Sequence, residues 1–365
     1  MSRRVYLHVG TPKSGTSYLQ DRLALNRARL EKAGLDYIQT RTGDHFEAAL
    51  DLIGERWAGE EKAARGQWDA LALEARKARR DILVSHEILA GANPEGVSRA
   101  MDSFPGHEVH VVVTARDLGR QIPAEWQEQI KHRGGRDYAA FLRAIQRNYP
   151  RTDWTMWFWR VQHLPQILSR WGAGLPAGRV HLVTVPPSDG PRGRLWERFA
   201  GAIGLDPRAS YDESKTTNAS LGGAEVTMLR RLNIELNDPR LPRETYVEWV
   251  RETIVREVLA RRPDMEPATA PPKRRPWIEA ITSDWLAEIS ESGVDVVGDL
   301  DDLRPVWPDP ETEKRVPRRV RQRNITDAAL DALVAVIEEA ARRDDPRELV
   351  GSKLGKATRR LRGGQ

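Results

Sequence analysis

The N-terminal segment constrains the fold more than any other part of the chain. The apolar run Val5–Val9 predicts a short buried strand, and Thr11–Ser17 follows it as a glycine-containing turn. Residues 18–33 carry leucines among charged side chains, as a surface helix does, and Gly34 marks the end of that helix. A strand, a tight loop and a helix in this order present backbone N–H groups and the positive helix end to an anion. We therefore expect an anion-binding loop here.

Strands and helices alternate along the first two hundred residues. Apolar runs predict further strands at residues 35–38, 82–85, 109–114 and 180–185. Val109–Thr114 is the strongest of them, because a β-branched run suits the centre of a parallel sheet. Helical segments are predicted between the strands at residues 46–80, 121–131, 154–171 and 195–203. This alternation predicts a three-layer α/β/α sandwich with a central parallel sheet, of the P-loop NTPase-like type.

The pattern after residue 210 is mainly helical. Helices are predicted at residues 223–236, 243–262, 276–292 and 326–343. We expect one α/β domain with helical acceptor-side insertions over residues 1–305. A basic linker over 306–325 and a C-terminal helix with a basic tail over 326–365 complete the expected organisation.

Composition limits the class of protein. Hydrophobic residues make up 39% of the chain and charged residues 30%, which is ordinary for a globular protein. There is no cysteine, so disulfides, thiolate zinc sites and a cysteine nucleophile are excluded. There is no long apolar run, and the apolar part of the N-terminus is too short for a signal peptide. We expect no transmembrane segment and a cytoplasmic location.

The positive charge is concentrated late in the sequence. Net charge is +5, and Lys314–Arg323 and Lys353–Arg362 are densely basic. No nucleic-acid recognition motif accompanies these runs, so we interpret them as solvated surface and expect no specific nucleic-acid partner.

The position of the lysine decides which anion the loop suits. Gly10 and Gly15 have the spacing of the G-x-x-x-x-G-K-[ST] phosphate loop of nucleoside triphosphate-binding proteins. Thr16 stands where that motif has its lysine, and the lysine of this chain is Lys13. The glycine spacing allows a nucleotide kinase, whereas the displaced lysine argues against one.

The segment Pro12-Lys13-Ser14-Gly15-Thr16-Ser17 resembles the 5′-phosphosulfate loop of the sulfotransferases that use 3′-phosphoadenosine 5′-phosphosulfate (PAPS). The resemblance implies that Lys13 stabilises the oxygen bridging phosphate and sulfate as sulfate departs. It implies that Ser14, Gly15, Thr16 and Ser17 donate to the 5′-phosphate. It also implies the product 3′-phosphoadenosine 5′-phosphate (PAP) and chemistry that requires no metal.

A second segment partly matches the sequence that binds the 3′-phosphate in members of this family. The family has an arginine at the end of a central strand and a serine eight residues later. Here Arg116 ends the strand, but Ala124 stands at the serine position. An arginine fork suits phosphate, and Arg120, Gln127 or Lys131 are candidates to replace the serine.

The third signal is the pair His86-Glu87, directly after the strand that ends at Ser85. In one branch of the family a histidine in this place is the base, and in another a glutamate. Neighbouring residues at a strand end point in opposite directions, so we expect only one of the two to reach the transfer site. We favour His86 because its unperturbed pKa suits a base at neutral pH.

The resemblance implies a hydroxyl or amine acceptor on a small molecule, a lipid or a glycan, and Trp126 is a candidate to contact it. Two other functions stay open. A P-loop kinase or nucleotide-binding protein would need a magnesium ligand, for which Asp117 is the candidate. A non-catalytic PAP-binding module would explain Ala124. Oligomeric state is also open.

Overall fold

The computed structural model describes residues 2–38, 45–57, 60–149, 156–188, 190–191, 193–215, 220–236, 241–308 and 320–343. The chain divides into two compact units. The first unit comprises Met1–Trp126, Tyr138–Asn218 and Thr269–Pro308, and the second comprises Gln127–Asp137, Ala219–Ala268 and Asp309–Gln365.

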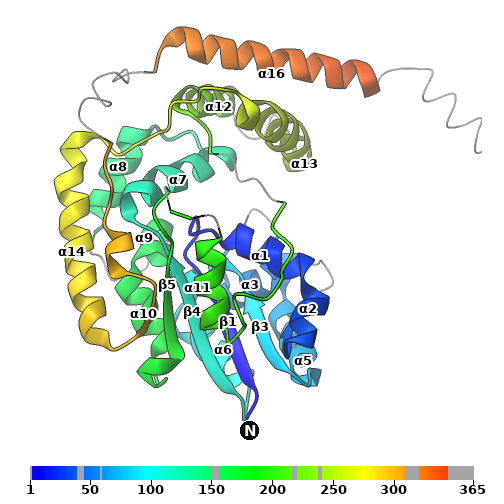
Figure 1. Ribbon diagram of the computed structural model, residues 1–365. Helices are drawn as coiled ribbons and strands as arrows, with labels where there is room; N and C mark the ends of the chain where they lie inside the picture. Colours follow the sequence, from blue (N-terminus) through cyan, green and yellow to red (C-terminus); the bar gives the residue numbers. More distant parts are fainter. Residues whose placement is uncertain are drawn as a thin grey trace, which may run out of the picture. The chain divides into compact units, whose positions relative to one another are not determined.

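The first unit is built on a six-stranded sheet in the order β2-β3-β1-β4-β5-β6, with every neighbouring pair parallel. The strands are β1 (Arg4–His8), β2 (Leu35–Tyr37), β3 (Asp81–Ser85), β4 (Glu108–Ala115), β5 (Val180–Thr184) and β6 (Asp295–Val297). All eight residues of β4 are buried or partly buried, as its β-branched sequence predicts for a central strand. Figure 1 shows this sheet with helices around it.

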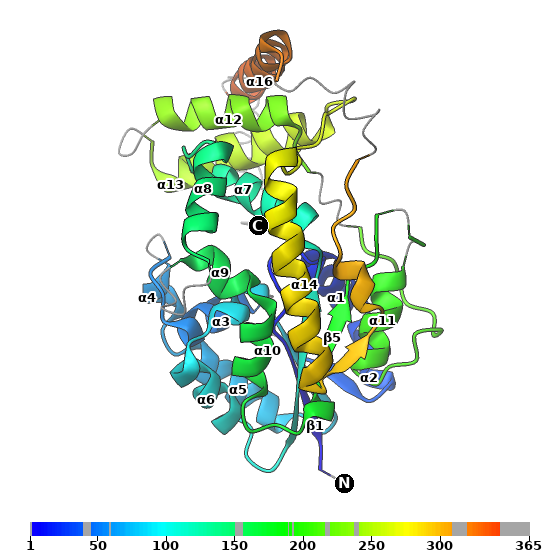
Figure 2. The same ribbon diagram turned by 90° about the vertical axis from the view of Figure 1, so that its left-hand side faces the viewer.

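Helices cover both faces of the sheet, which gives three layers (Figure 2). One face carries α1 (Thr16–Leu25), α2 (Arg27–Lys32) and α11 (Arg194–Ala202). Alternate strand residues Tyr6, Leu83, Val112 and Val183 meet side chains of these helices in one buried cluster. The other face carries α5 (Gln67–Lys77), α6 (Pro94–Asp102) and α10 (Leu164–Gly172). The predicted three-layer α/β/α architecture is confirmed.

Further helices complete the first unit. They are α3 (Phe46–Ile53), α4 (Glu61–Ala64), η1 (Glu87–Gly91), α8 (Tyr138–Arg147), α9 (Trp157–Gln162), η2 (Ala177–Arg179), η5 (Pro272–Arg274), α14 (Arg275–Ser292) and η6 (Leu300–Leu303). Helix α7 (Leu118–Lys131) starts in the first unit and ends in the second.

Several predicted elements differ from the structure. The region after residue 210 also supplies a strand, because β6 pairs with β5 at the edge of the sheet. The segment predicted as one helix at 154–171 is divided at His163, whose side chain accepts from the N–H of Gln166 and caps α10. Pro165, at the start of α10, has no N–H to continue the preceding helix.

The second unit is helical in its described part. It contains α12 (Gly223–Glu235), α13 (Arg243–Thr245), a π-helix η3 (Tyr246–Val258), η4 (Leu259–Arg261) and α16 (Gln322–Arg343). Asn233 donates to the Ile130 carbonyl at 2.7 Å and accepts from the Tyr246 hydroxyl at 2.7 Å, so a buried amide joins α7, α12 and η3. None of the helices in the described ranges is long and apolar enough to cross a membrane.

Candidate active site

The loop after β1 is a tight turn with three residues at positive φ. Gly10 has φ 37°, Lys13 has φ 68° and Gly15 has φ 86°. A Cβ on Gly10 would lie 2.6 Å from Thr16 Cγ2, and a Cβ on Gly15 would lie 2.5 Å from Leu195 Cδ2. Both positions therefore require glycine, and Lys13 holds a conformation that an L-residue adopts only when its surroundings impose it.

Helix α1 begins at Thr16, directly after Gly15, with its N-terminus open to an anion. Gly15 provides no side-chain cap, and the first turn contains no acidic residue. The first N–H groups of a helix need acceptors, and here no side chain of the helix start satisfies them. Thr16 is buried and Ser17 is half-buried at this end.

Three of the predicted site segments meet at the carboxyl ends of the central strands. β1 lies between β3 and β4, and in a parallel sheet the carboxyl ends lie on the same side. The pairing continues past the strand ends, since His86 N donates to His8 O at 3.1 Å and Thr11 N donates to Thr114 O at 2.8 Å. The phosphate loop, the His86-Glu87 pair and Arg116 therefore lie at the same, carboxyl end of the sheet.

Ser14 uses its donors within the loop. Its N–H donates to the Thr11 carbonyl at 3.2 Å and its hydroxyl donates to the same oxygen at 2.6 Å. The hydroxyl also lies 2.7 Å from the Thr114 hydroxyl, and Ser14 is 0% exposed. In this structure Ser14 shapes the turn, and its contact with a phosphate stays a prediction.

Two buried glutamines hold the carbonyl of Pro12. Gln121, in the first turns of α7, donates to it, and Gln162 donates to it at 3.0 Å. Gln121 also donates to the Gln162 side-chain oxygen at 2.8 Å. Pro12 is therefore a fixed structural element of the loop, next to Lys13.

Glu87 lies on the loop side of the site. Gln20 of α1 donates to Glu87 Oε2 at 3.0 Å and to the Ser85 carbonyl at 3.4 Å. Burial by itself raises the pKa of Glu87, but His86, the hydrogen bonds it accepts and the charge of Lys13 outweigh burial and lower the pKa below its usual range. The carboxylate is thus ionised at neutral pH and feels the charge of Lys13.

His86 has different surroundings. Its ring lies 5.6 Å from that of Phe46, and its Nδ1 accepts from the Ile88 N–H at 3.3 Å, which caps η1. The same Nδ1 lies 3.9 Å from Glu87 Oε2. Its side chain is 12% exposed, against 24% for Glu87.

The guanidinium of Arg116 is partly buried. Within the described residues it forms no ion pair with a carboxylate. Its Nε donates to Gln121 Oε1 at 3.0 Å and its Nη2 donates to the Arg120 carbonyl at 3.0 Å. Burial, with the nearby charge of Arg120, lowers the pKa of Arg116 to about 10. A bound anion would relieve both costs.

Arg120, predicted to bind the cofactor, is engaged within the protein. It forms an ion pair with Asp117 and donates to the Pro186 carbonyl at 3.2 Å from both terminal nitrogens. Asp117 is 4% exposed and also accepts from the Arg120 N–H at 2.9 Å. This pairing occupies the carboxylate that a magnesium-dependent kinase would need.

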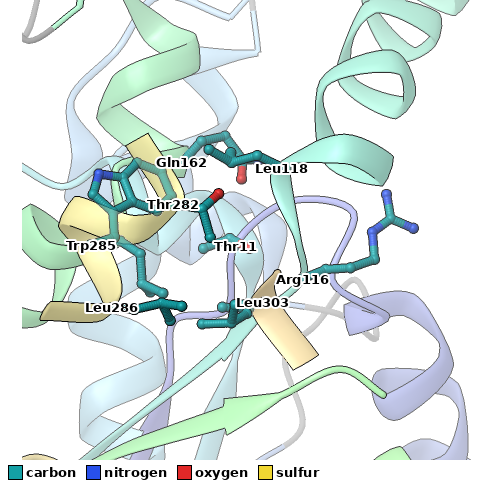
Figure 3. A pocket seen from close by; sticks show the side chains of 10 residues that line it. Thr11, Arg116, Leu118, Gln162, Thr282, Trp285, Leu286 and Leu303 are labelled. Atoms are coloured by element: carbon teal, nitrogen blue, oxygen red, sulfur yellow. The ribbon is translucent and has the colours of Figure 1, made fainter. Parts of the chain in front are cut away.

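A small cavity lies behind the loop. Its volume is about 10 Å³, which is room for about one water molecule. Figure 3 shows the lining side chains, with the guanidinium of Arg116 directed away from Trp285 and Leu286. The cavity is therefore no nucleotide site, and the charged end of Arg116 lies outside it.

The residues proposed to support the site have other partners. Trp126 is 5% exposed and packs on Tyr138 with ring centroids 4.7 Å apart, so it is a core residue rather than a surface for an acceptor. In the second unit, Gln127 donates to the Leu221 carbonyl at 3.0 Å and accepts from Ser220 at 3.1 Å. Gln127 is thereby engaged by the segment that precedes α12.

Sequence reasoning missed the residues that hold the site together. Gln20, Gln121 and Thr114 carry no motif signal. His8 carried one, because it is a polar residue inside the apolar strand β1, and it proves to be 0% exposed. Its Nδ1 lies 2.7 Å from Ser85 Oγ and its Nε2 lies 3.1 Å from Thr114 Oγ1.

No family model and no curated protein sequence matches the chain. Among solved structures it is similar to a sulfotransferase from Alicyclobacillus acidocaldarius, with 14% identity and a TM-score of 0.39 over 60% of this chain and 87% of that chain. It is also similar to the sulfotransferase domain from the curacin biosynthetic pathway, with 11% identity and a TM-score of 0.31 over 60% and 81%. A third is the sulfotransferase domain from the Synechococcus PCC 7002 olefin synthase, with 13% identity and a TM-score of 0.31 over 66% and 96%. These likenesses are too distant to assign an activity. Any functional assignment must come from the residues of this chain.

Proposed function

We propose that the chain is a sulfotransferase that moves a sulfuryl group from PAPS to a hydroxyl or amine of a small-molecule, lipid or glycan acceptor. One observation carries the proposal. Lys13 is held at φ 68° in a turn that leads into helix α1, which Gly15 leaves without a side-chain cap, and Glu87 follows the neighbouring strand β3 at the same end of the sheet. Lys13, a cation that can stabilise the leaving oxygen, and Glu87, a carboxylate that can accept the proton of the acceptor, thus lie at the same end of the sheet.

The loop fits a 5′-phosphosulfate. Gly10 and Gly15 allow the positive φ angles of the tight turn, and the start of α1 offers N–H donors with no side-chain cap from Gly15. Thr16 and Ser17 open this helix, in agreement with their expected role at the 5′-phosphate.

Arg116 fits the 3′-phosphate better than Arg120 does. Arg116 has a buried charge without a carboxylate partner in the described part of the chain, whereas Arg120 is neutralised by Asp117. The absence of a serine at Ala124 leaves Arg116 as the main charged donor for that phosphate.

We assign the base to Glu87 rather than to His86. A base needs an open lone pair in its resting state. Glu87 is ionised by its surroundings, among which His86 lowers its pKa most, while Nδ1 of His86 is turned to the Ile88 N–H. The lowered pKa weakens Glu87 as a base, but the negative charge is available at neutral pH.

The reaction follows from these assignments. The acceptor oxygen or nitrogen forms a bond to sulfur as the bond from sulfur to the bridging oxygen breaks. The acceptor proton passes to Glu87, and the ammonium of Lys13 stabilises the charge left on the bridging oxygen. PAP leaves with that oxygen.

The test measures ligand binding and transfer separately. Calorimetry with PAP, and with ATP plus Mg²⁺, compares the parent with Lys13→Ala and with the surface control Lys77→Ala. We expect PAP to bind the parent, Lys13→Ala to weaken transfer from labelled PAPS to an acceptor panel by at least about a hundredfold, and Lys77→Ala to change neither. Tight binding of ATP with Mg²⁺ in place of PAP would overturn the proposal in favour of a kinase.

Glu87→Gln and His86→Gln distinguish the two candidate bases. We expect Glu87→Gln to reduce kcat by about 10² to 10⁴ with PAP affinity retained, and His86→Gln to have a smaller effect. The opposite order would return the role to His86.

A further inference from the structure

A continuous chain of buried side chains connects three strand ends behind the proposed site. His8 ends β1, Ser85 ends β3, and Thr114 lies one residue before the end of β4. All three are buried, with exposed fractions of 0%, 1% and 0%. The chain continues through the Ser14 hydroxyl to the Thr11 carbonyl.

The direction of every bond in this chain follows from its last acceptor. A carbonyl only accepts, so the Ser14 hydroxyl donates to Thr11 O at 2.6 Å. The proton of Ser14 is then used, and the Thr114 hydroxyl must donate to Ser14 Oγ across their 2.7 Å separation.

The same reasoning fixes the tautomer of His8. With its proton directed at Ser14, Thr114 Oγ1 accepts from His8 Nε2–H at 3.1 Å. His8 Nδ1 is left as an acceptor, and Ser85 Oγ–H donates to it at 2.7 Å. Burial keeps the ring neutral, since it lowers the pKa of His8 to about 3.

The chain also ties the base to the loop. Ser85 is two residues before Glu87, and its backbone N–H donates to His45 Nδ1 at 3.0 Å. His45 Nε2 in turn donates to the Ile38 carbonyl at 2.7 Å, just after β2. The carboxyl ends of four adjacent strands are thereby connected by two imidazole rings.

We propose that His8 is a positioning residue: as a neutral imidazole protonated at Nε2, it fixes the Lys13 turn and the Glu87 strand end in one mutual register. It contacts neither substrate nor cofactor. It acts by holding the Thr114 hydroxyl, which in turn bonds Ser14 in the turn where Lys13 has φ 68°. The catalytic part of this inference rests on the proposed sulfotransferase function.

The matched control is a second histidine of the same sheet. His110 of β4 is partly buried and lies 2.9 Å from His181 and 2.8 Å from Glu108, away from the loop. Its substitution perturbs a comparable hydrogen-bonded histidine without touching the chain from Ser85 to Thr11. The variants are His8→Phe, Thr114→Val and His110→Gln, and Thr114→Val preserves shape if His8→Phe fails to fold.

The first measurement needs no donor or acceptor. ¹⁵N NMR of imidazole-labelled protein should find His8 protonated at Nε2 and unprotonated at Nδ1. In Thr114→Val the acceptor of Nε2 is lost, and we expect the proton to move to Nδ1 and donate to Ser85. Amide exchange of residues 11–17 should accelerate in His8→Phe as well as in Thr114→Val and stay unchanged in His110→Gln. A His8 ring protonated at Nδ1 in the parent, or unchanged loop exchange in Thr114→Val, overturns the proposal.

The second measurement separates positioning from stability. If the parent transfers sulfate, we expect Thr114→Val to reduce kcat by up to about a hundredfold, with a smaller change in KM and with His110→Gln near the parent value. An equal loss in His8→Phe and His110→Gln would mean that His8 acts only through fold stability. A parent that binds no PAP contradicts the proposed function, while the NMR and exchange results still decide the role of His8.

Discussion

Gln20 Nε2 donates to Glu87 Oε2 at 3.0 Å, which ties the carboxylate at the end of β3 to the helix that starts at the phosphate loop. Burial raises the pKa of Glu87. His86, a backbone hydrogen bond, this bond from Gln20 and the charge of Lys13 together lower it below its usual range. Gln20 thus holds the proposed base in position and contributes to its lowered pKa.

Gln20→Leu should therefore raise the pKa of Glu87 and release its carboxylate. A group with a lowered pKa is active above that pKa, so the acidic limb of the kcat/KM profile should move to higher pH. We expect kcat at neutral pH to fall by about ten- to a hundredfold, as for a charged hydrogen bond worth about 1.5–3 kcal/mol. A pH profile identical to that of the parent would show that Gln20 does not act on the base.

Arg116 and Arg120 should respond differently to truncation. Arg116→Met should weaken PAP binding by about tenfold or more with a small loss of stability, because its guanidinium has no buried carboxylate to leave behind. Arg120→Met should instead destabilise the fold by about 3 kcal/mol, since it strands the buried Asp117. Calorimetry with PAP and urea unfolding of both variants make the comparison. Equal PAP affinities for Arg116→Met and the parent would remove Arg116 from the site.

Gly15 and Gly34 form a pair that separates crowding from backbone strain. Both have strongly positive φ, 86° and 90°, but a Cβ added at Gly34 meets no atom, whereas one added at Gly15 would lie 2.5 Å from Leu195 Cδ2. Gly34→Ala should cost about 1–2 kcal/mol of stability and leave PAP binding intact. Gly15→Ala should cost more and weaken PAP binding, because the Leu195 side chain or the turn must also shift to admit the methyl group. Retained PAP affinity in Gly15→Ala would contradict the assignment of the loop.

Acid should destabilise the fold through His8. An unfolded histidine takes up a proton near its ordinary pKa, whereas burial lowers the pKa of His8 in the folded state to about 3. The unfolded state therefore binds more protons between these values, and the free energy of unfolding decreases as pH falls from about 6.5 to about 3, by up to about 5 kcal/mol. Buried His163, whose pKa is lowered to about 4, adds in the same direction. Urea unfolding at several pH values should give a flatter dependence for His8→Phe than for the parent, and parallel curves would refute this role of His8.

The sequence predicts the parts of the fold that depend on local pattern. The β-branched run of β4 and the loop from Gly10 to Gly15 can be recognised, because burial on both faces and positive φ restrict the residue types allowed. The three-residue strand β6 is too short for such a pattern, and it forms because β5 offers it an edge. Pairing with a distant strand leaves no local signal.

The candidate site likewise has parts that the sequence predicts and parts that it does not. The loop, Arg116 and the His86-Glu87 pair were found by their positions after strands. What the sequence does not contain is the partner of each group. Arg120 pairs with Asp117, and Gln20 of α1 reaches Glu87 across the sheet edge. The preference between His86 and Glu87 rested on unperturbed pKa values, and the environment of each side chain changes that comparison.

Calorimetric titration of the parent protein with PAP, followed by transfer of label from PAPS in the presence of the acceptor panel, tests the proposed function most directly. We predict that PAP binds one site per chain without Mg²⁺, that Lys13→Ala loses transfer, and that Glu87→Gln loses transfer while it still binds PAP. Absence of PAP binding by the folded parent protein would contradict the proposed function.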